Sequence, residues 1–210
     1  MIKNVVFDFG QVMVHFRPRW MVERYVSDEW DVQLLTEVVF DRLYWDRLDA
    51  GTITDAEVLD GCRGRLPQRL WETAEEIYRG WMDNIPEIDG MSALVQQLKK
   101  NGVPVFLLSN ISKGFAERAG EFSVLRGFDK MVFSGVCGMV KPDLAIFKYL
   151  CETCDIAPEE TMFIDDSQKN LDGAKAYGIC GYLFDGNVEK LREHLQGLGL
   201  LGAVGCKRKN

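Results

Sequence analysis

Four groups of polar residues in this 210-residue chain are of types that could do chemistry together. Each group follows a short apolar run or opens a helical pattern. In chain order the groups are Asp8, then Ser109 with Asn110, then Lys141 before Pro142, and finally Asp165 and Asp166 with Asn170. Taken singly, each group has an ordinary structural explanation as a turn residue, a helix cap or a surface lysine. The case for chemistry therefore depends on their being brought together.

Brought together, the four groups would suit phosphoryl transfer. Two acidic strand ends on one rim repel each other unless a cation lies between them, and carboxylate oxygens are ligands that suit Mg²⁺. A hydroxyl, free backbone N–H groups and a lysine beside that cation would hold a phosphate. A carboxylate next to such a cradle could attack phosphorus and form an aspartyl-phosphate.

The elements that would position these residues alternate along the chain. Apolar, β-branched runs typical of buried strands are followed by amphipathic helical patterns, which predicts an α/β fold with a doubly wound parallel sheet and helices on both faces. In such sheets ligands bind at the carboxyl ends of the strands, where the polar groups fall. The expected strands are 2–7, 103–108, 130–133, 161–164 and 179–184, and the expected helices are 90–100, 142–154, 168–177 and 188–196.

One interval is too long for an ordinary strand–helix–strand step. Asp8 and Ser109 are about 100 residues apart, whereas such a step needs only a few tens. The segment 16–85 has many helix signals and almost no strand signals. The helix signals include a capping box at 54–57 and Pro67 at the first position of a helix over 68–82. The sequence therefore predicts a catalytic core of residues 1–15 and 86–210, with an all-helical lid of residues 16–85 inserted after the first strand.

The predicted lid is rich in aromatic residues, which at helical spacing usually form core. Tyr44 or Trp45 could instead face the cleft and stack on a sugar ring, and Arg17 and Arg19 near the start of the lid are expected to be solvated. The aromatic residues expected to be mainly core are Trp20, Tyr25, Trp30, Phe40, Tyr44, Trp45, Trp71, Tyr78 and Trp81.

Charge and composition argue against several classes of protein. Asp and Glu (32) outnumber Lys and Arg (25), giving a net charge of −7, and no basic stripe offers a surface to nucleic acid. No apolar run approaches the roughly 18 residues of a membrane span, and the opening residues lack a signal peptide's apolar region. We therefore expect a cytoplasmic protein with neither a nucleic-acid nor a membrane partner.

The cysteines are expected to be reduced thiols, because the chain is large enough to fold without disulfides. Cys151 and Cys154 form a C-x-x-C pair, but no second pair follows and both histidines are distant in the sequence, so a structural zinc is not expected. The basic end of the chain, 207–210, is expected to be a solvated tail. The six cysteines are Cys62, Cys137, Cys151, Cys154, Cys180 and Cys206.

Four short motifs in this order resemble those of the haloacid dehalogenase (HAD) superfamily of phosphatases and hydrolases. VVFDFGQV at 5–12 is similar to its first motif, VFLLSN at 105–110 to its second, Lys141-Pro142 to its third and FIDDSQKN at 163–170 to its fourth. The resemblance spans almost the whole chain, and the helical insertion after the first motif resembles the family's cap of the first type.

The resemblance implies roles for individual residues. Asp8 would be the nucleophile and a metal ligand, and Gly10 would offer its backbone carbonyl to Mg²⁺. The remaining roles fall to Asp166 as the second carboxylate ligand, to Asp165 and Asn170 in the outer shell, and to Ser109, the Asn110 backbone N–H and Lys141 as the groups that hold the transferring phosphoryl group.

The chain departs from the family's pattern at Gly10. Most phosphatases that it resembles have a second Asp there, as acid for the leaving group and base for water, and such a group contributes roughly 10²–10⁴-fold to the rate. Either another residue substitutes, or the enzyme favours leaving groups that depart unprotonated. His15 is a candidate substitute, although a packed or surface histidine is the commoner interpretation.

The resemblance thus implies a Mg²⁺-dependent phosphatase of a small phosphorylated metabolite. The Asp-x-Gly-Gln-Val variant at 8–12 is similar to a branch with sugar-1-phosphate phosphatases, and a hexose-1-phosphate would suit the missing acid because its leaving oxygen is more acidic than an ordinary alcohol's. Two alternatives stay open: a metal-free 2-haloacid dehalogenase, disfavoured by the Asp165–Asp166 pair, and a catalytically weak protein with a binding or regulatory role. Neither the physiological substrate nor the oligomeric state is predicted.

Overall fold

The described part of the chain contains a five-stranded parallel sheet. A computed structural model describes residues 1–202; Cys206 and the predicted tail at 207–210 lie outside the described residues. The strands lie in the order β3-β2-β1-β4-β5, and every neighbouring pair is parallel. Their bounds are β1 Asn4–Phe7, β2 Val105–Ser109, β3 Lys130–Phe133, β4 Thr161–Asp165 and β5 Cys180–Leu183.

The central strand places the catalytic edge. Phe7 of β1 pairs with Leu107 of β2 on one side and Ile164 of β4 on the other. Asp8 follows Phe7 directly, so it leaves the sheet beside the ends of β2 and β4, where Ser109 and Asp165 lie. The parallel register therefore brings three of the four predicted polar groups to one edge, as expected for strands that point the same way.

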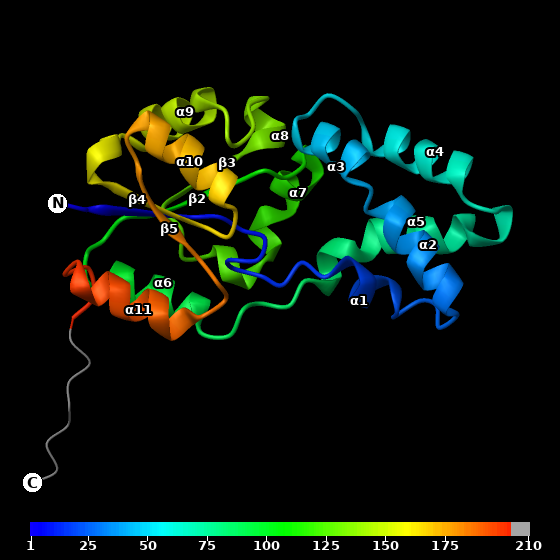
Figure 1. Ribbon diagram of the computed structural model, residues 1–210, viewed down its shortest axis with the longest axis horizontal. Helices are drawn as coiled ribbons and strands as arrows, with labels where there is room; N and C mark the ends of the chain where they lie inside the picture. Colours follow the sequence, from blue (N-terminus) through cyan, green and yellow to red (C-terminus); the bar gives the residue numbers. More distant parts are fainter. Residues whose placement is uncertain (203–210) are drawn as a thin grey trace, which may run out of the picture.

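Helices cover both faces of the sheet, which confirms the predicted doubly wound class (Figure 1). One face packs against α6 (Met91–Lys100) and α11 (Val188–Gly197) in the cluster that contains Phe7. The other packs against α9 (Leu144–Cys154) and α10 (Gln168–Tyr177) in the cluster that contains Val6. Successive β1 side chains thus point to opposite faces. Shorter helices, α7 (Lys113–Arg118) and α8 (Ser134–Cys137), follow β2 and β3.

Cys151 and Cys154 belong to the second of these cores. Both lie on α9 with free thiols, and burial raises the pKa of each to about 11, which keeps them protonated. A neutral, packed thiol is a poor zinc ligand. Within residues 1–202, the one group of His, Cys, Asp or Glu with metal-site spacing is Asp8, Asp165 and Asp166.

The long segment inserted between β1 and α6 consists mainly of helices. Within the described residues 16–85 there is no strand, and the helices are α1 Pro18–Val22, α2 Glu29–Val39, α3 Arg42–Asp49, α4 Asp55–Arg65 and α5 Trp71–Gly80. The predicted capping box is confirmed: Thr54 accepts from the Glu57 N–H, and the Glu57 carboxylate accepts from the Thr54 N–H. We call residues 16–85 the helical insertion.

The predicted helix over 68–82 is wrong in its details. Pro67 does not occupy a first helical position, because its ψ of 144° is extended; it caps a 3₁₀ turn at Gln68–Leu70. Helix α5 then begins at Trp71 and ends at Gly80, before a second 3₁₀ turn at Trp81–Asn84. The prediction merged three short elements, because tight turns at helix ends have the same sequence signals as the helix itself.

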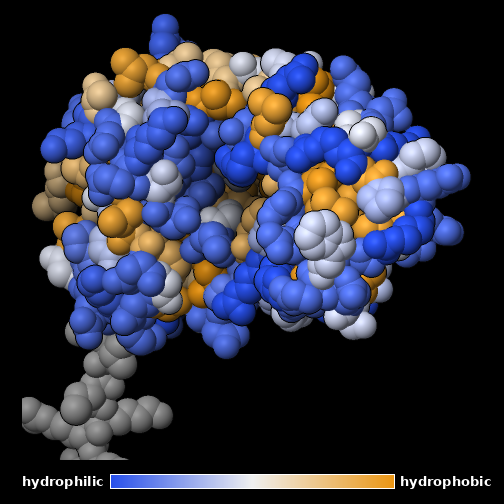
Figure 2. Space-filling view, turned by 45° about the vertical axis from the view of Figure 1, so that its right-hand side comes forward, coloured by the Kyte–Doolittle hydropathy of each residue, from blue (hydrophilic) through white to orange (hydrophobic). Residues whose placement is uncertain are grey.

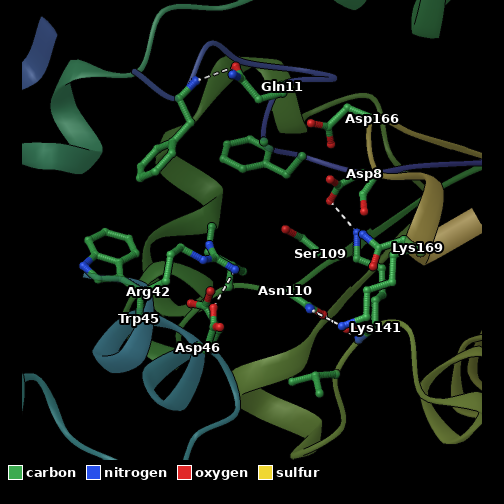
Figure 3. A pocket seen from close by; sticks show the side chains of 18 of the residues that line it. Asp8, Gln11, Arg42, Trp45, Asp46, Ser109, Asn110, Lys141, Asp166 and Lys169 are labelled. Atoms are coloured by element: carbon green, nitrogen blue, oxygen red, sulfur yellow. Dashed lines mark hydrogen bonds and ion pairs between the residues drawn. The ribbon is translucent and has the colours of Figure 1, made fainter. Parts of the chain in front are cut away.

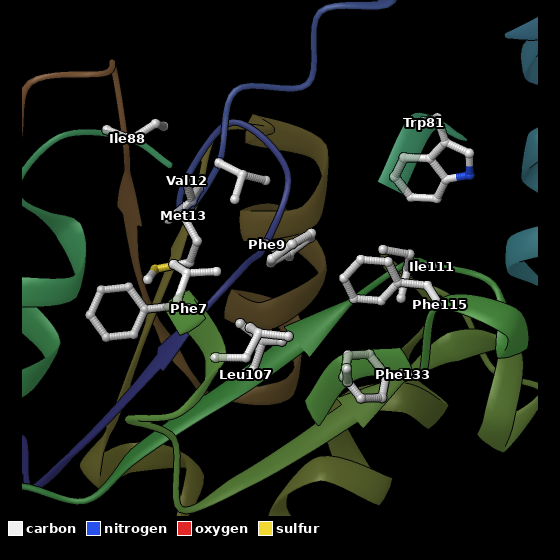
Figure 4. Packing of buried hydrophobic residues seen from close by; sticks show 14 of the residues in the cluster. Phe7, Phe9, Val12, Met13, Trp81, Ile88, Leu107, Ile111, Phe115 and Phe133 are labelled. Atoms are coloured by element: carbon white, nitrogen blue, oxygen red, sulfur yellow. The ribbon is translucent and has the colours of Figure 1, made fainter. Parts of the chain in front are cut away.

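Two connecting segments join the insertion to the rest of the chain side by side. Val14 and Glu87 form an antiparallel bridge, flanked by hydrogen bonds from the His15 N–H to the Pro86 carbonyl (2.8 Å) and from the Ile88 N–H to the Met13 carbonyl (2.9 Å). Aromatic packing adds a second connection, shown in Figure 4. Trp81 of the insertion stacks on Phe115 of α7 with ring centroids 5.9 Å apart, and Phe115 in turn contacts Phe9.

No helix within the described residues has both the length and the apolar character that crossing a membrane requires.

Gly173 on α10 provides a test of how tightly this fold holds the third motif. A Cβ at Gly173 would clash with the Pro142 carbonyl oxygen and lie 2.8 Å from the Pro142 Cβ. Gly173→Ala should therefore displace the Lys141–Pro142 segment and lower the free energy of unfolding by about 1–3 kcal/mol, the usual cost of overpacking. Urea denaturation measures this loss.

The matched control is Gly64→Ala on α4, where a Cβ would meet nothing within 4 Å. This change should leave stability unchanged or raise it by up to about 1 kcal/mol, because alanine favours helix more than glycine does. Equal effects of the two substitutions would contradict the close contact at Gly173.

Candidate active site

Asp8, Lys141 and Asp165 meet at the carboxyl edge of the sheet. Asp8 follows β1, Asp165 ends β4, and Lys141 reaches both from the loop before α9. Lys141 Nζ lies 2.7 Å from Asp8 Oδ1 and 2.8 Å from Asp165 Oδ2. All three residues are buried. The ammonium group therefore bridges two carboxylates where bulk water screens their charges little.

Asn110 holds the backbone of Lys141 in place. Its side-chain Nδ2 donates to the Lys141 carbonyl (3.0 Å), and its Oδ1 accepts from the Lys141 N–H (2.8 Å). Ser109, the residue before it, is buried at the end of β2. The second motif thus positions the lysine of the third motif through the Asn110 side chain, while its backbone N–H is the group predicted to bind phosphate.

Asp165 has its acceptor oxygens occupied by the protein. Its Oδ1 accepts from the Ser167 N–H (2.8 Å) and from Asn170 Nδ2 (3.0 Å), and its Oδ2 accepts from Lys141 Nζ and Asn170 Nδ2 (3.1 Å). A carboxylate held by so many donors has little capacity for a direct metal bond. This geometry supports the predicted outer-shell role of Asp165 and Asn170.

The negative charge of the three neighbouring carboxylates suits a hard divalent cation. One oxygen each from Asp8, Asp165 and Asp166 lie within 4.8 Å of one another, and Asp166 is exposed. When all three are ionised, Lys141 neutralises one of the three charges and leaves an excess of two. Two negative charges on oxygen donors are the environment that Mg²⁺ prefers. Asp8 and Asp166 are the carboxylates whose placement suits direct contact with it.

The pKa values reflect this crowding of negative charge. Burial raises the pKa of Asp8 to about 7; Lys141 opposes that rise and Asp165 adds to it. Partial desolvation by the pocket wall, although Asp166 is exposed to solvent, and the neighbouring Asp165 raise the pKa of Asp166. Burial alone would lower the pKa of Lys141, but Asp8 and Asp165 outweigh it and raise that pKa, so the ammonium stays charged. Binding of either protons or a cation therefore relieves the repulsion between these carboxylates.

A pocket of about 600 Å³ opens directly above these residues. Figure 2 shows the hollow between the sheet-bearing part and the helical insertion. In Figure 3, Asp8, Ser109, Lys141 and Asp166 lie on one side of the pocket, while Arg42, Trp45 and Asp46 of α3 face them from the other. The volume is that of a small-molecule site.

A family model described as haloacid dehalogenase-like hydrolase matches residues 2–178, most of the chain. The chain belongs to the haloacid dehalogenase-like hydrolases. This membership confirms the predicted family, and with it the prediction that the protein is an enzyme that hydrolyses its substrate.

Relatives of this HAD-like hydrolase include phosphatases. A sesquiterpene phosphatase from Aspergillus oryzae is 28% identical over 189 residues, 85% of this chain and 88% of that protein. A D-ribitol-5-phosphate phosphatase from Bacteroides thetaiotaomicron is 27% identical over 188 residues, 85% of this chain and 90% of that protein. A HAD family enzyme from the same species, solved in complex with magnesium and inorganic phosphate, has a TM-score of 0.68 at 26% identity, covering 91% of this chain and 99% of that chain. These similarities support the predicted phosphatase chemistry and the predicted Mg²⁺ cofactor.

The structure of this HAD-like hydrolase gathers the predicted site residues in one place, although their roles stay predictions. Asp165 forms an ion pair with Lys141 and is not among the residues that line the pocket. His15, the candidate substitute acid, is not among the residues that line the pocket; its Nδ1 lies 3.4 Å from the Arg17 guanidinium. The predicted residues that line the pocket are Asp8, Gly10, Ser109, Asn110, Lys141, Asp166 and Asn170.

Sequence reasoning missed the contribution of α3. Arg42, Asp46 and Asp49 line the pocket beside Trp45. Their spacing of three or four residues puts them on one face of a helix, and this spacing was the available signal. It could not be used without knowing which face of the insertion meets the sheet edge.

The expectation that the aromatic residues of the insertion are mainly core is only partly correct. Phe40, Trp45, Tyr78 and Trp81 are buried, and Tyr44 is half-buried. The other four are exposed by more than a third, because a small bundle of short helices has too little interior to enclose nine large rings. Those four are Trp20, Tyr25, Trp30 and Trp71.

Two further expectations about the insertion concern single side chains. Of Tyr44 and Trp45, Trp45 lines the pocket, and Tyr44 is not among the lining residues described. Arg19 forms surface ion pairs with Glu23 and Glu29, in agreement with its expected solvation.

Proposed function

We propose that this HAD-like hydrolase is a Mg²⁺-dependent phosphatase of a small phosphorylated metabolite, and that it works through an aspartyl-phosphate on Asp8. The observation that carries the proposal is the placement of the Asp8 carboxylate. It lies at the floor of a 600 Å³ pocket, bonded to Lys141 and within 4.8 Å of two further carboxylates. A nucleophile, a fixed cation and a divalent-metal set in one pocket are the parts that phosphoryl transfer needs.

In this mechanism an oxygen of Asp8 attacks phosphorus, and the ester oxygen leaves toward the pocket opening. Lys141 offsets the charge on the transferring group while Asp165 and Asn110 keep its ammonium in position. Ser109 and the Asn110 N–H hold the remaining phosphoryl oxygens. Mg²⁺, held by Asp8, Asp166 and the Gly10 carbonyl, would supply charge stabilisation as a Lewis acid. Water then hydrolyses the aspartyl-phosphate and restores Asp8.

The helical insertion (16–85) is proposed as a cap over a catalytic core of residues 1–15 and 86–210. The paired segments at Val14 and Glu87 are where the two parts join, and they are placed to serve as a hinge. A cap that closes over the pocket would exclude bulk water during transfer.

A sugar phosphate, such as a hexose-1-phosphate, is the finer substrate class we propose. Phe16, Trp45 and Trp81 form an aromatic wall, with ring centroids 5.1–5.8 Å apart, opposite the carboxylates. Such a wall offers a sugar ring an apolar face, and Arg42 and Asp46 beside it offer hydrogen bonds to hydroxyl groups.

The metal-free dehalogenase is the less favoured alternative. A solved L-2-haloacid dehalogenase from Xanthobacter autotrophicus shares the fold, at a TM-score of 0.64 and 18% identity. A metal-free dehalogenation would need no cation, so it does not account for the excess negative charge around Asp166. The binding-protein alternative is supported by Gly10 alone.

Phosphate release tests the proposal. We expect the protein to release phosphate from an aryl phosphate, sugar-1-phosphates and sugar-6-phosphates with Mg²⁺, and to lose that activity by at least 10²-fold with EDTA, because two carboxylates are then left uncompensated. Preference for the aryl and anomeric phosphates would support the finer class. No release from any of them, with Mg²⁺ present and the protein folded by circular dichroism, would contradict the proposal.

A further inference from the structure

Asp49, the last residue of α3, is a buried carboxyl group in the pocket wall that the proposed mechanism does not use. It lines the same pocket as Asp8 but comes from the helical insertion. Its Oδ1 is inaccessible to solvent, and no group within residues 1–202 forms a hydrogen bond with it. An unpartnered polar atom in a protein interior costs free energy, so it calls for an explanation.

The position of Asp49 is fixed against the sheet-bearing part of the chain. The Asp49 carbonyl accepts a hydrogen bond of 2.6 Å from Ser134 Oγ, and that oxygen accepts one of 2.9 Å from the Ile111 N–H. Two residues on, Gly51 has φ +70°, and a Cβ there would lie 3.1 Å from the Gly135 carbonyl oxygen. The end of α3 is therefore docked on the segment that follows β3. This contact brings Asp49 to the pocket when the insertion is seated.

No structural role accounts for the Asp49 carboxyl group. Arg42, two turns earlier on the same face of α3, pairs with Asp46 instead, and no ion pair of Asp49 occurs among the described residues. The C-terminal end of a helix is also unfavourable for an anion. Burial raises the pKa of Asp49 to about 8; Arg42 and Lys141 oppose the rise, and Asp46 and Asp8 add to it. The group is thus held mainly in its protonated form near neutral pH.

A protonated carboxyl is the group that the sequence lacks at Gly10. A Cβ at Gly10 would meet nothing within 4 Å, so the space for a side chain next to Asp8 is open. Asp49 lines the same pocket as Gly10 and Asp8, so α3 brings a carboxyl group to the cavity that contains this open space.

We propose that Asp49 is the general acid and base of this hydrolase, supplied by the helical insertion in place of a residue at position 10. In the first step Asp8 bonds to phosphorus, the ester P–O bond breaks, and the Asp49 proton passes to the leaving oxygen. In the second step water attacks the phosphorus of the aspartyl-phosphate, the Asp49 carboxylate takes a proton from that water, and the bond to Asp8 breaks. The inference rests on the proposed phosphatase function.

Aryl and alkyl phosphates of increasing leaving-group basicity test this role. For Asp49→Asn we expect kcat/KM, which reports transfer to Asp8, to fall by about 10²–10⁴-fold with benzyl phosphate. With 4-nitrophenyl phosphate it should fall by less than about 10-fold, since that leaving group needs no proton. Asp49→Asn should also show a burst of 4-nitrophenolate followed by slow turnover, because hydrolysis of the aspartyl-phosphate lacks its base.

Two variants sharpen the result. Gly10→Asp added to Asp49→Asn should restore kcat/KM for benzyl phosphate by at least about 10-fold, because a carboxyl at position 10 has room to reach the same oxygen. Asp60→Asn, the same change at an exposed position on α4, should alter neither substrate's kinetics. Thermal unfolding of each variant shows whether it is folded.

The pH profile of the unmodified protein gives a measurement that needs no variant. The charged groups that act on Asp49 are Arg42 and Asp46 on its own helix, and Asp8 and Lys141 across the pocket. Because the acid form is the active one, kcat/KM for benzyl phosphate should decline above about pH 8, whereas that for 4-nitrophenyl phosphate should decline much less.

The outcomes separate the two proposals. Equal losses with all leaving groups, no burst and no rescue by Gly10→Asp would overturn the role of Asp49 while leaving the phosphatase intact. If Asp49→Asn does not fold, an equal decline of kcat/KM above about pH 8 with good and poor leaving groups would overturn the role of Asp49 while leaving the phosphatase intact. Absence of phosphate release by the unmodified protein would overturn both the proposed function and the inference.

Discussion

Replacing Asp8 with asparagine is expected to lower kcat for phosphate release by at least about 10⁴-fold on every substrate. The substitution keeps the shape of the side chain but removes the oxygen nucleophile, and loss of a nucleophile cannot be compensated by binding. Steady-state phosphate release in saturating Mg²⁺ measures the effect. Because both the attack and the covalent intermediate need Asp8, aryl and alkyl phosphates should be affected alike.

The Asp8→Asn protein should nevertheless be folded. Burial raises the pKa of Asp8 from 3.8 to about 7, so the folded state holds a proton there that the unfolded state has already lost between about pH 4 and 7. Stability contributed by Asp8 therefore falls as the pH rises through that window, and asparagine removes this loss. Relative to the unmodified protein, the variant should gain in melting temperature between pH 4 and 7.

Asp155→Asn is the matched control for Asp8→Asn. Asp155 is exposed and has a left-handed backbone conformation, φ 57°, which asparagine also adopts readily. Its kinetics should equal those of the unmodified protein. Retention of more than about 1% of the activity by Asp8→Asn would show that Asp8 is not the nucleophile.

Replacing Lys141 with methionine is expected to destabilise the metal-free protein by about 3–5 kcal/mol, the usual cost of removing one partner of a buried ionic group. Methionine fills a similar volume, so the loss comes from charge: Asp8 and Asp165 are left facing each other without their shared ammonium. Activity should fall as well, because the fixed cation that offsets the transferring phosphoryl charge is gone. Urea denaturation and phosphate release measure the two effects.

The pH and Mg²⁺ dependence of this loss identify its cause. Without Lys141 the pKa of Asp8 rises further above its unfolded value, because the ammonium group that lowers it is gone. The variant therefore loses further stability relative to the unmodified protein as the pH rises above about 7. Mg²⁺ should recover part of the loss, because it binds the carboxylates of the folded state. Lys148→Met, at an exposed position on α9 paired with Glu152 at 3.8 Å, should change stability by less than about 1 kcal/mol. A loss independent of pH would contradict the electrostatic explanation.

Much of the fold follows from local sequence patterns. The apolar runs that end in Asp8, Ser109 and Asp165 are strands at the predicted places, and the parallel sheet with helices on both faces follows from their alternation with helices. Because parallel strands all end at one edge, the sequence also determined that these three residues would meet. The error at Pro67 arose where an extended residue, a 3₁₀ turn and a helix share the same local signals.

Local sequence patterns did not predict how the helical insertion packs against the sheet. Arg42, Trp45 and Asp49 have the spacing of a helix face, but that spacing is equally typical of a face that packs within the insertion. Only the docking of α3 through Ser134, 85 residues further along the chain, turns this face toward Asp8. His15, which is near Gly10 in sequence, is not among the residues that line the pocket, while Asp49, distant in sequence, is.

The sequence by itself thus determined the family, the parallel sheet and the residues gathered at its edge, because strand direction and motif order are local properties of the chain. The tertiary structure decided which side of the helical insertion faces the edge, how Asn110 and Asp165 hold Lys141, and that the Asp49 carboxyl is buried without a partner. Those features depend on contacts between residues far apart in the chain. Burial and charge at such contacts are set by the packing as a whole, which no local pattern encodes.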